Sequence, residues 1–153
     1  MSHWLIIPCN GIGNPLSTVS RFAAFRAAEL LRQRGISVEL LAIGQLLARL
    51  APAMEKVAEC PVAIIEGCSY KCASKLLERL EVNPAAYVYI PDVMQSVGLG
   101  RRGLDRKYLG PKGRAIVEAV AERLAECIAH ADAQNSAKAA RGAAMCCEED
   151  DQR

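Results

Sequence analysis

Two cysteines four residues apart follow a short run of apolar and β-branched residues. Cys68 and Cys72 come after residues 62–65 (Val-Ala-Ile-Ile) and the pair Glu66-Gly67. Apolar and β-branched residues closed by a glycine, and followed by a helix-forming segment, indicate a strand, a tight turn and a helix. Positions four apart on a helix share one face, and a helix N-terminus lowers the pKa of a thiol placed there. Both thiols can therefore contact the same metal ion or the same redox partner.

The elements that must position these thiols alternate along the chain. Hydrophobic patterning predicts strands over 4–8, 37–43, 61–66 and 86–90, and helices over 17–34, 45–58 (broken at Pro52), 69–80 and 111–131. Four alternations of strand and helix predict an α/β fold. We expect a doubly wound, mostly parallel four-stranded sheet with the three layers of Rossmann and flavodoxin-like proteins. Pro91 is interpreted as the end of the fourth strand, and residues 94–114 as a long basic surface loop with one helical turn near 104–108.

The predicted fold brings a third cysteine to the first two. Cys9 follows the first strand and Cys68 follows the third, and these strands are neighbours in a flavodoxin-like sheet. Ligands of such sheets bind outside the carboxyl ends of the strands. We therefore expect Cys9, Cys68 and Cys72 to surround one thiophilic metal, for which zinc is the best match. Glu66, two residues before Cys68, is a candidate base, outer partner or oxygen ligand, or else a solvated turn carboxylate.

The remaining cysteines and the two histidines lack the spacing of metal ligands to these three. Cys60 and Cys127 are predicted to be packing residues, and Cys146 and Cys147 to have no ordered role, while His3 and His130 are predicted to lie on the solvated surface.

Composition describes a soluble protein with reduced thiols. The 153 residues are 52% hydrophobic and 24% charged, with a formal net charge of +2, too small to indicate a nucleic-acid or membrane surface. We expect one domain over 1–132 and a disordered tail over 133–153. Seven cysteines are an odd number for a disulfide framework, and no signal peptide or membrane span is recognisable. We predict a cytoplasmic protein whose partners are a metal ion and an unidentified small molecule or protein.

Two other functions remain open on these residues. In a metal-free thiol enzyme, Cys68 would be the nucleophile, activated by the helix N-terminus, with Cys72 or Cys9 resolving it. In an anion- or nucleotide-binding module, the Gly11–Gly13 turn would act together with the basic loop. That loop would offer Arg101, Arg102 or Lys112, although charge runs more often face water. No reaction or oligomeric state is predicted.

The two cysteine segments resemble the DGC-domain family, whose members are described as zinc-binding. The segments are Pro8-Cys9-Asn10-Gly11-Ile12-Gly13 and residues 64–73, Ile-Ile-Glu-Gly-Cys-Ser-Tyr-Lys-Cys-Ala. The family is named for Asp-Gly-Cys after a hydrophobic strand, with a second cysteine four residues on. Here Glu66 stands in place of the aspartate and keeps a carboxylate. The resemblance implies metal binding with no named reaction, and a fourth ligand would come from Glu66, from water or substrate, or from a cysteine of the tail.

Overall fold

The protein alternates strands and helices throughout. The structure, a computed structural model, describes the backbone of residues 2–146 and the side chains of residues 2–137. In chain order the elements are β1 (His3–Pro8), α1 (Pro15–Gln33), β2 (Ser37–Leu40), α2 (Ile43–Leu47), α3 (Ala51–Glu59), β3 (Val62–Glu66), α4 (Cys72–Arg79), β4 (Ala86–Tyr89), α5 (Ile90–Ser96) and α6 (Gly110–Cys146).

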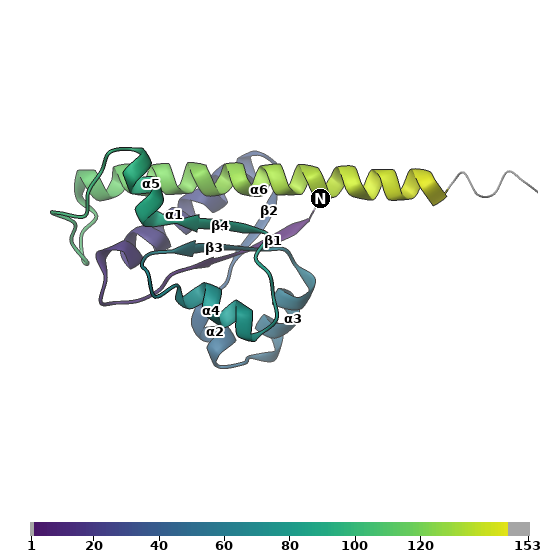
Figure 1. Cartoon of the computed structure of the whole chain (residues 1–153), viewed down its shortest axis with the longest axis horizontal. Helices are drawn as coiled ribbons and strands as arrows, with labels where there is room; N and C mark the ends of the chain where they lie inside the picture. Colours follow the sequence, from purple (N-terminus) through teal and green to yellow (C-terminus); the bar gives the residue numbers. More distant parts are fainter. Residues whose placement is uncertain (1, 147–153) are drawn as a thin grey trace, which may run out of the picture.

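The four strands form one parallel sheet in the order β2-β1-β3-β4. The predicted α/β fold is confirmed, and β1 and β3 are neighbours as expected. Their register pairs Ile7 with Ile64 and Pro8 with Ile65, so both strands end at the same edge. Figure 1 shows the loops that follow β1 and β3 at the end toward which the strands run, together with the loop between α5 and α6.

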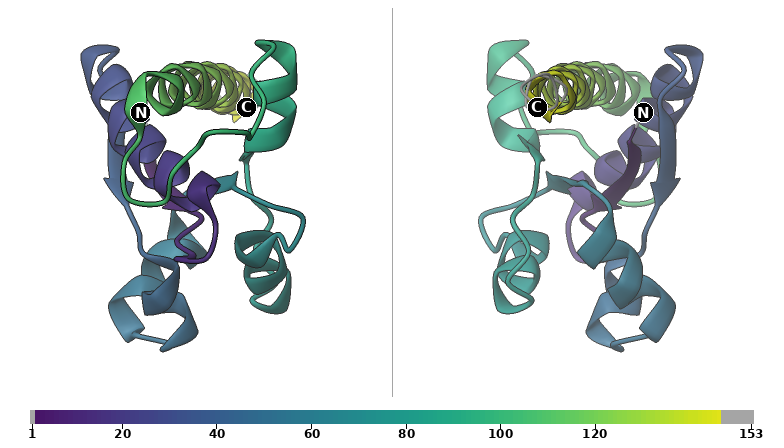
Figure 2. Two further views of the ribbon diagram at one scale, coloured as in Figure 1. Left: turned by 90° about the vertical axis from the view of Figure 1, so that its left-hand side faces the viewer. Right: turned by 90° about the vertical axis from the view of Figure 1, so that its right-hand side faces the viewer.

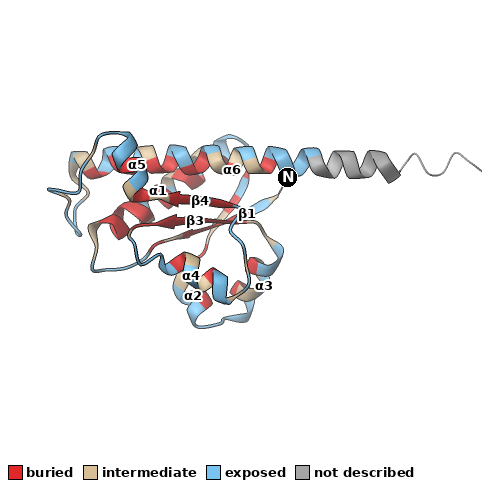
Figure 3. Ribbon diagram, in the orientation of Figure 1, coloured by how far each residue is buried: buried red, intermediate tan, exposed pale blue. Residues whose placement is uncertain are grey.

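The sheet lies between two helical layers, as the end views of Figure 2 show. Every residue from Trp4 to Ile7 in β1 is fully buried, because successive side chains point to opposite faces and both faces are covered. Trp4 and Ile6 pack with α1, α5 and α6, whereas Leu5 and Ile7 pack with α2, α3 and α4. Figure 3 shows the buried residues concentrated on the sheet and on the inward helix faces.

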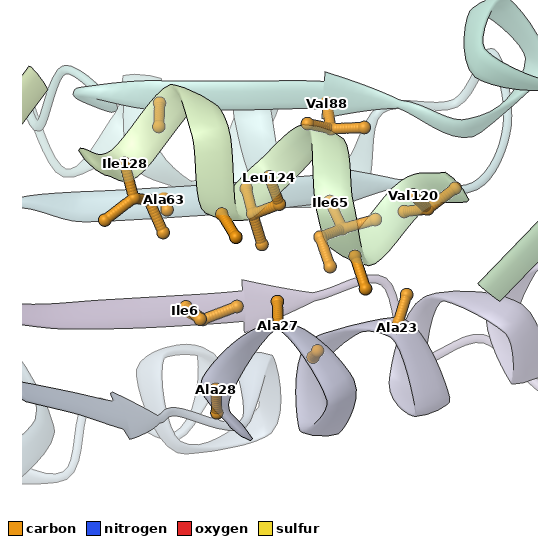
Figure 4. Close-up of a cluster of buried hydrophobic side chains, with 14 of the residues drawn as sticks. Ile6, Ala23, Ala27, Ala28, Ala63, Ile65, Val88, Val120, Leu124 and Ile128 are labelled. Atoms are coloured by element: carbon orange, nitrogen blue, oxygen red, sulfur yellow. The ribbon is translucent and has the colours of Figure 1, made fainter. Parts of the chain in front are cut away.

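Alanines on α1 bring it close to the sheet and to α6. Ala23, Ala27 and Ala28 are almost fully buried and pack in the same cluster as Leu124 and Ile128 of α6 (Figure 4). Because an alanine adds only one methyl group to the backbone, the helix axes can approach closely without leaving a void. This packing fixes α1, whose first turn forms one wall of the site described below.

Local structure differs from the sequence prediction at the ends of several elements. The fourth strand ends before Pro91, as predicted, but the chain then folds directly into α5, which covers the start of the predicted loop. A proline in the first turn costs no hydrogen bond and favours helix formation, so Pro91 begins α5 instead. Pro52 likewise lies at the start of α3 and separates it from α2, so the predicted break is confirmed. The segment expected to contain a helical turn near 104–108 has none.

The last helix is longer than predicted. It runs to Cys146, whereas the sequence predicted its end at Ala131 because the hydrophobic periodicity stops there. Alanine and lysine are strong helix formers, which favours continuation of the helix beyond the end of its apolar periodicity. Burial nevertheless stops at Asp132, and residues 133–137 are exposed. The end of the predicted tail, residues 147–153, lies outside the described residues. No helix of the described chain has the length and apolar character needed to cross a bilayer.

One buried polar contact attaches α6 to β1. The indole Nε1 of Trp4 donates to Oδ1 of Asp132 at 3.1 Å, and the backbone N of Ser2 donates to the same oxygen at 3.4 Å. The bond from Trp4 lowers the pKa of Asp132, although burial acts in the opposite direction. A carboxyl group with a lowered folded-state pKa stabilises the fold above its unfolded pKa, about 3.9, and this contribution is lost as the pH falls through the folded value.

We therefore expect Asp132→Ala to lower the free energy of unfolding at neutral pH by about 1.5–3 kcal/mol, the range for a hydrogen bond to a charged group. The substitution should also flatten the decline of stability below about pH 4, because the linked proton uptake disappears. Urea unfolding at several pH values measures both effects. Glu126→Gln, an exposed change on the same helix, is the control. Unfolding curves of Asp132→Ala that keep the wild-type pH dependence would contradict this assignment.

Candidate functional site

Cys9 extends β1 to the edge of the sheet. Its backbone N donates to the carbonyl of Ile65 at 2.9 Å, so the pairing of β1 with β3 continues to this residue. The residue is buried. A Cβ built on Gly67 would lie 3.4 Å from the Cys9 sulfur and 3.4 Å from the carbonyl group of Leu16 in α1. The turn that carries Cys68 is therefore packed directly against Cys9 and the first turn of α1.

Glu66 faces α4 rather than solvent. The alternation of β3 directs it to the same side as Val62 and Ile64, and only 1% of it is exposed. Its Oε1 accepts hydrogen bonds from the backbone N of Ser74 at 2.7 Å and from the Ser74 hydroxyl at 2.9 Å. Ser74 lies in the first turn of α4, so the strand supplies the cap that the helix lacks locally. The alternative of a solvated turn carboxylate is wrong.

The helix after β3 begins later than predicted. It starts at Cys72, and Cys68 lies in the preceding turn, so the two thiols do not share a helix face. Lys71, between them, has a left-handed backbone with φ 49°, a conformation uncommon outside glycine. Its Nζ lies 5.4 Å from the ring centroid of Tyr89 and 5.8 Å from that of Tyr87. These cation–π contacts attach the cysteine turn to the edge strand β4.

The three predicted cysteines line one cavity of about 660 Å³. The loop after β1 contributes Cys9, and the loop after β3 with the start of α4 contributes Cys68 and Cys72. Cys9 is buried, Cys68 partly exposed and Cys72 exposed. The tertiary structure thus brings sulfurs separated by about 60 residues of chain to one cavity. In the described part of the chain, however, no three His, Cys, Asp or Glu side chains are grouped closely enough to hold a metal ion.

The thiol of Cys72 is held protonated more strongly than an isolated cysteine. Partial burial raises its pKa, and the neighbouring Cys9, Glu66 and Cys68 raise it further by electrostatic repulsion. The expectation that a helix N-terminus lowers the pKa is therefore wrong for Cys72, because burial and the neighbouring acidic groups raise it. Cys9, Glu66 and Cys68 therefore lie close enough to Cys72 to act on its thiol electrostatically.

Two other cysteines and both histidines do not line this cavity. Cys60 packs at the margin of the cluster beneath β1 and β3, and Cys127 at the margin of the α1–α6 cluster, both as predicted. His3 and His130 are exposed, in agreement with the prediction. The side chains of Cys146 and Cys147 lie outside the described residues.

The basic loop contributes one of its three candidate cations. Arg101 lines the cavity, and its Nη2 donates to Oδ1 of Asn14 at 3.2 Å. Arg102 and Lys112 are not among the lining residues; the Lys112 ammonium instead donates to the carbonyl of Arg102 at 2.8 Å. The Gly11–Gly13 turn lines the same cavity. Residues of the predicted cysteine site and of the predicted anion site thus line the same cavity.

Sequence reasoning did not identify the apolar wall of this cavity. Ile43 and Leu47 of α2 line it, although the segment containing Ile43 was expected to be strand. Tyr70, from the cysteine turn, also lines it and is 74% exposed. A partly buried isoleucine or an exposed leucine gives no local signal for a site, because apolar atoms make up much of any protein surface.

The fold and the site define a class: a three-layer α/β protein with a cysteine-lined cavity at the carboxyl edge of a parallel sheet. Residues 5–107 match the DGC domain, which is more than half of the chain. The chain therefore belongs to the DGC domain family. The match includes all three cysteines of the cavity and Arg101, and it ends before α6. No curated protein and no solved structure matches the chain.

Proposed function

We propose that the protein binds a thiophilic metal ion, zinc in particular, through Cys9, Cys68 and Cys72. One observation carries the proposal: three free thiols from two separate strand-to-helix connections line a single cavity at the position where doubly wound sheets bind ligands. Membership of the DGC domain family supports it. Zinc is the ion that three thiolates suit best, because it accepts soft sulfur ligands in a tetrahedral shell.

The donor set fits the ion in kind, and closure of the cysteine turn would complete the fit in space. The sulfurs share a cavity without forming a compact group of three. Residues 69–72 are exposed, so a movement of this turn toward Cys9 would leave the core intact and would change mainly the contacts of Lys71 with Tyr87 and Tyr89. Zinc would favour the thiolate form of Cys72, which burial and the neighbouring acidic groups otherwise disfavour. Metal binding would then fix the turn between Glu66 and α4, and a three-thiolate shell would leave one position for a further ligand.

The hydrogen bonds of Glu66 favour a role in orienting the site over direct coordination of the metal. Its Oε1 already accepts two hydrogen bonds from Ser74, and in the described part of the chain no hydrogen bond reaches its second oxygen. Through Ser74 it orients the first turn of α4, which begins at Cys72. Residues that orient a metal ligand strengthen metal binding without touching the ion.

Metal content and ligand count test the proposal. Protein purified reduced, without chelators or metal-affinity resin, should contain about one equivalent of zinc. X-ray absorption should give three sulfur neighbours and one lighter atom, and the double variant Cys146→Ser/Cys147→Ser should leave that count unchanged. If the wild type showed a fourth sulfur neighbour and the double variant lost it, Cys146 or Cys147 would be the fourth ligand. Protein that takes up no stoichiometric metal would overturn the proposal and favour a metal-free thiol enzyme.

A further inference from the structure

The cavity is much larger than a metal site requires. A single water molecule occupies about 30 Å³ of liquid, whereas pockets for small organic ligands measure about 300–1,000 Å³. At about 660 Å³, this cavity has the size of an organic ligand site. Its lining combines the three thiols with the apolar side chains of Ile43 and Leu47 and the ring of Tyr70. A compound that fills the cavity therefore has an apolar body and one end at the sulfurs.

One guanidinium group supplies the only permanent charge among the side chains that line this cavity. Arg101 donates to the neutral amide oxygen of Asn14, which also caps α1 by accepting from the N of Leu16 at 3.0 Å. Within residues 2–137, no carboxylate lies within ion-pair distance of Arg101. The loop that carries it is anchored to α1, because the Thr18 hydroxyl donates to the carbonyl of Arg106 at 2.8 Å. Arg101 is thus a positioned cation with donors left for a ligand.

The balance of charge selects the kind of anion. One guanidinium matches a carboxylate in charge and in its paired-oxygen geometry. A phosphate monoester at neutral pH carries close to two negative charges, whereas the lining of this cavity offers one positive charge. A nucleotide or phosphate would therefore remain under-neutralised in this cavity.

We infer that the cavity binds a small organic carboxylate that bears a sulfur at its other end. Arg101 binds the carboxylate, Ile43, Leu47 and Tyr70 contact the body, and the sulfur faces Cys9, Cys68 and Cys72. This inference rests on the proposed function for its sulfur end, because a three-thiolate metal has a position for one more soft donor. The carboxylate end depends on Arg101 alone and can be tested with or without metal.

Isothermal titration with 3-mercaptopropionate tests the inference. Two comparison probes each lack one end of the proposed ligand: 3-mercapto-1-propanol has no carboxylate, and butyrate has no sulfur. Wild type, Arg101→Gln and Arg102→Gln are each titrated with and without one equivalent of zinc. Arg102 is the matched control because it is the exposed neighbour whose side chain is not part of the cavity lining. Melting temperatures confirm that the variants remain folded.

We expect Arg101→Gln to weaken 3-mercaptopropionate about ten- to a hundredfold, the loss typical of a charge-assisted hydrogen-bonded pair. Binding of 3-mercapto-1-propanol should not change, and Arg102→Gln should alter neither. Weaker binding of the carboxylate probes alone in Arg101→Gln supports the carboxylate end of the inference. In protein that binds no zinc, this result still supports the carboxylate end, whereas the proposed function and the sulfur end that rests on it both fail. Equal losses in both variants, or equal binding of the acid and the alcohol, overturn the inference. Inorganic phosphate that binds more tightly than 3-mercaptopropionate also overturns the inference. Zinc-loaded protein that binds none of the probes overturns it too, but leaves the proposed function standing.

Discussion

Cys9→Ser, Cys68→Ser and Cys72→Ser should each lower zinc affinity by more than about a hundredfold. Removing even an outer partner of a metal ligand costs about ten- to a hundredfold in affinity, so removing one of three sulfur ligands costs more. Cys9 provides the strictest test, because it is buried and lies far from the other two in the chain. Competition with a chromophoric chelator measures the three affinities on one scale.

Cys60→Ser and Cys127→Ser are the matched controls for these variants. Both remove a partly buried thiol that packs at the margin of a core cluster and does not line the cavity. Each should retain zinc affinity within a few-fold of wild type. If Cys9→Ser bound zinc as tightly as these controls, Cys9 would not be a ligand, and the site would reduce to the Cys68–Cys72 turn.

Glu66→Ala should lower the free energy of unfolding by about 2–4 kcal/mol. The change removes a charge-assisted bond to the N of Ser74 and a bond to its hydroxyl, and leaves the first turn of α4 without a cap. It also leaves a void between β3 and α4, since the side chain is almost fully buried. Because α4 is only eight residues long, we expect Cys72 to lose its position and zinc affinity to fall as well. Urea unfolding and the chelator competition measure the two losses.

Two milder variants separate positioning by Glu66 from direct ligation. Glu66→Gln keeps an oxygen acceptor for Ser74, so a positioning role predicts zinc affinity within a few-fold of wild type. Ser74→Ala removes one of the two bonds and should cost about 1 kcal/mol in stability. A loss of zinc in Glu66→Gln as large as in Cys68→Ser would show that the carboxylate is itself a ligand. Unchanged stability in Glu66→Ala would contradict the capping role.

The sequence alone determines the fold and the edge at which chemistry is concentrated. The apolar runs of β1 and β3 are long enough to be buried on both faces, which requires helices on both sides of the sheet. Parallel connections then bring the carboxyl ends of both strands to one edge, so Cys9 and Cys68 could be expected near each other from order and period alone. These features depend on local pattern, and such patterns can be detected without knowing the contacts.

Only the tertiary structure decided what surrounds the sulfurs. The bond between Arg101 and Asn14 spans 87 positions, and that between Trp4 and Asp132 spans 128, so neither leaves a local signature. The role of Glu66 depends on which layer its strand face meets, and in the fold that layer is α4. Ile43 and Leu47 became cavity walls because β2 ends at Leu40 and the chain turns into α2. Residue types and periodicity therefore predict which donors exist, whereas packing between distant segments decides which of them face one cavity.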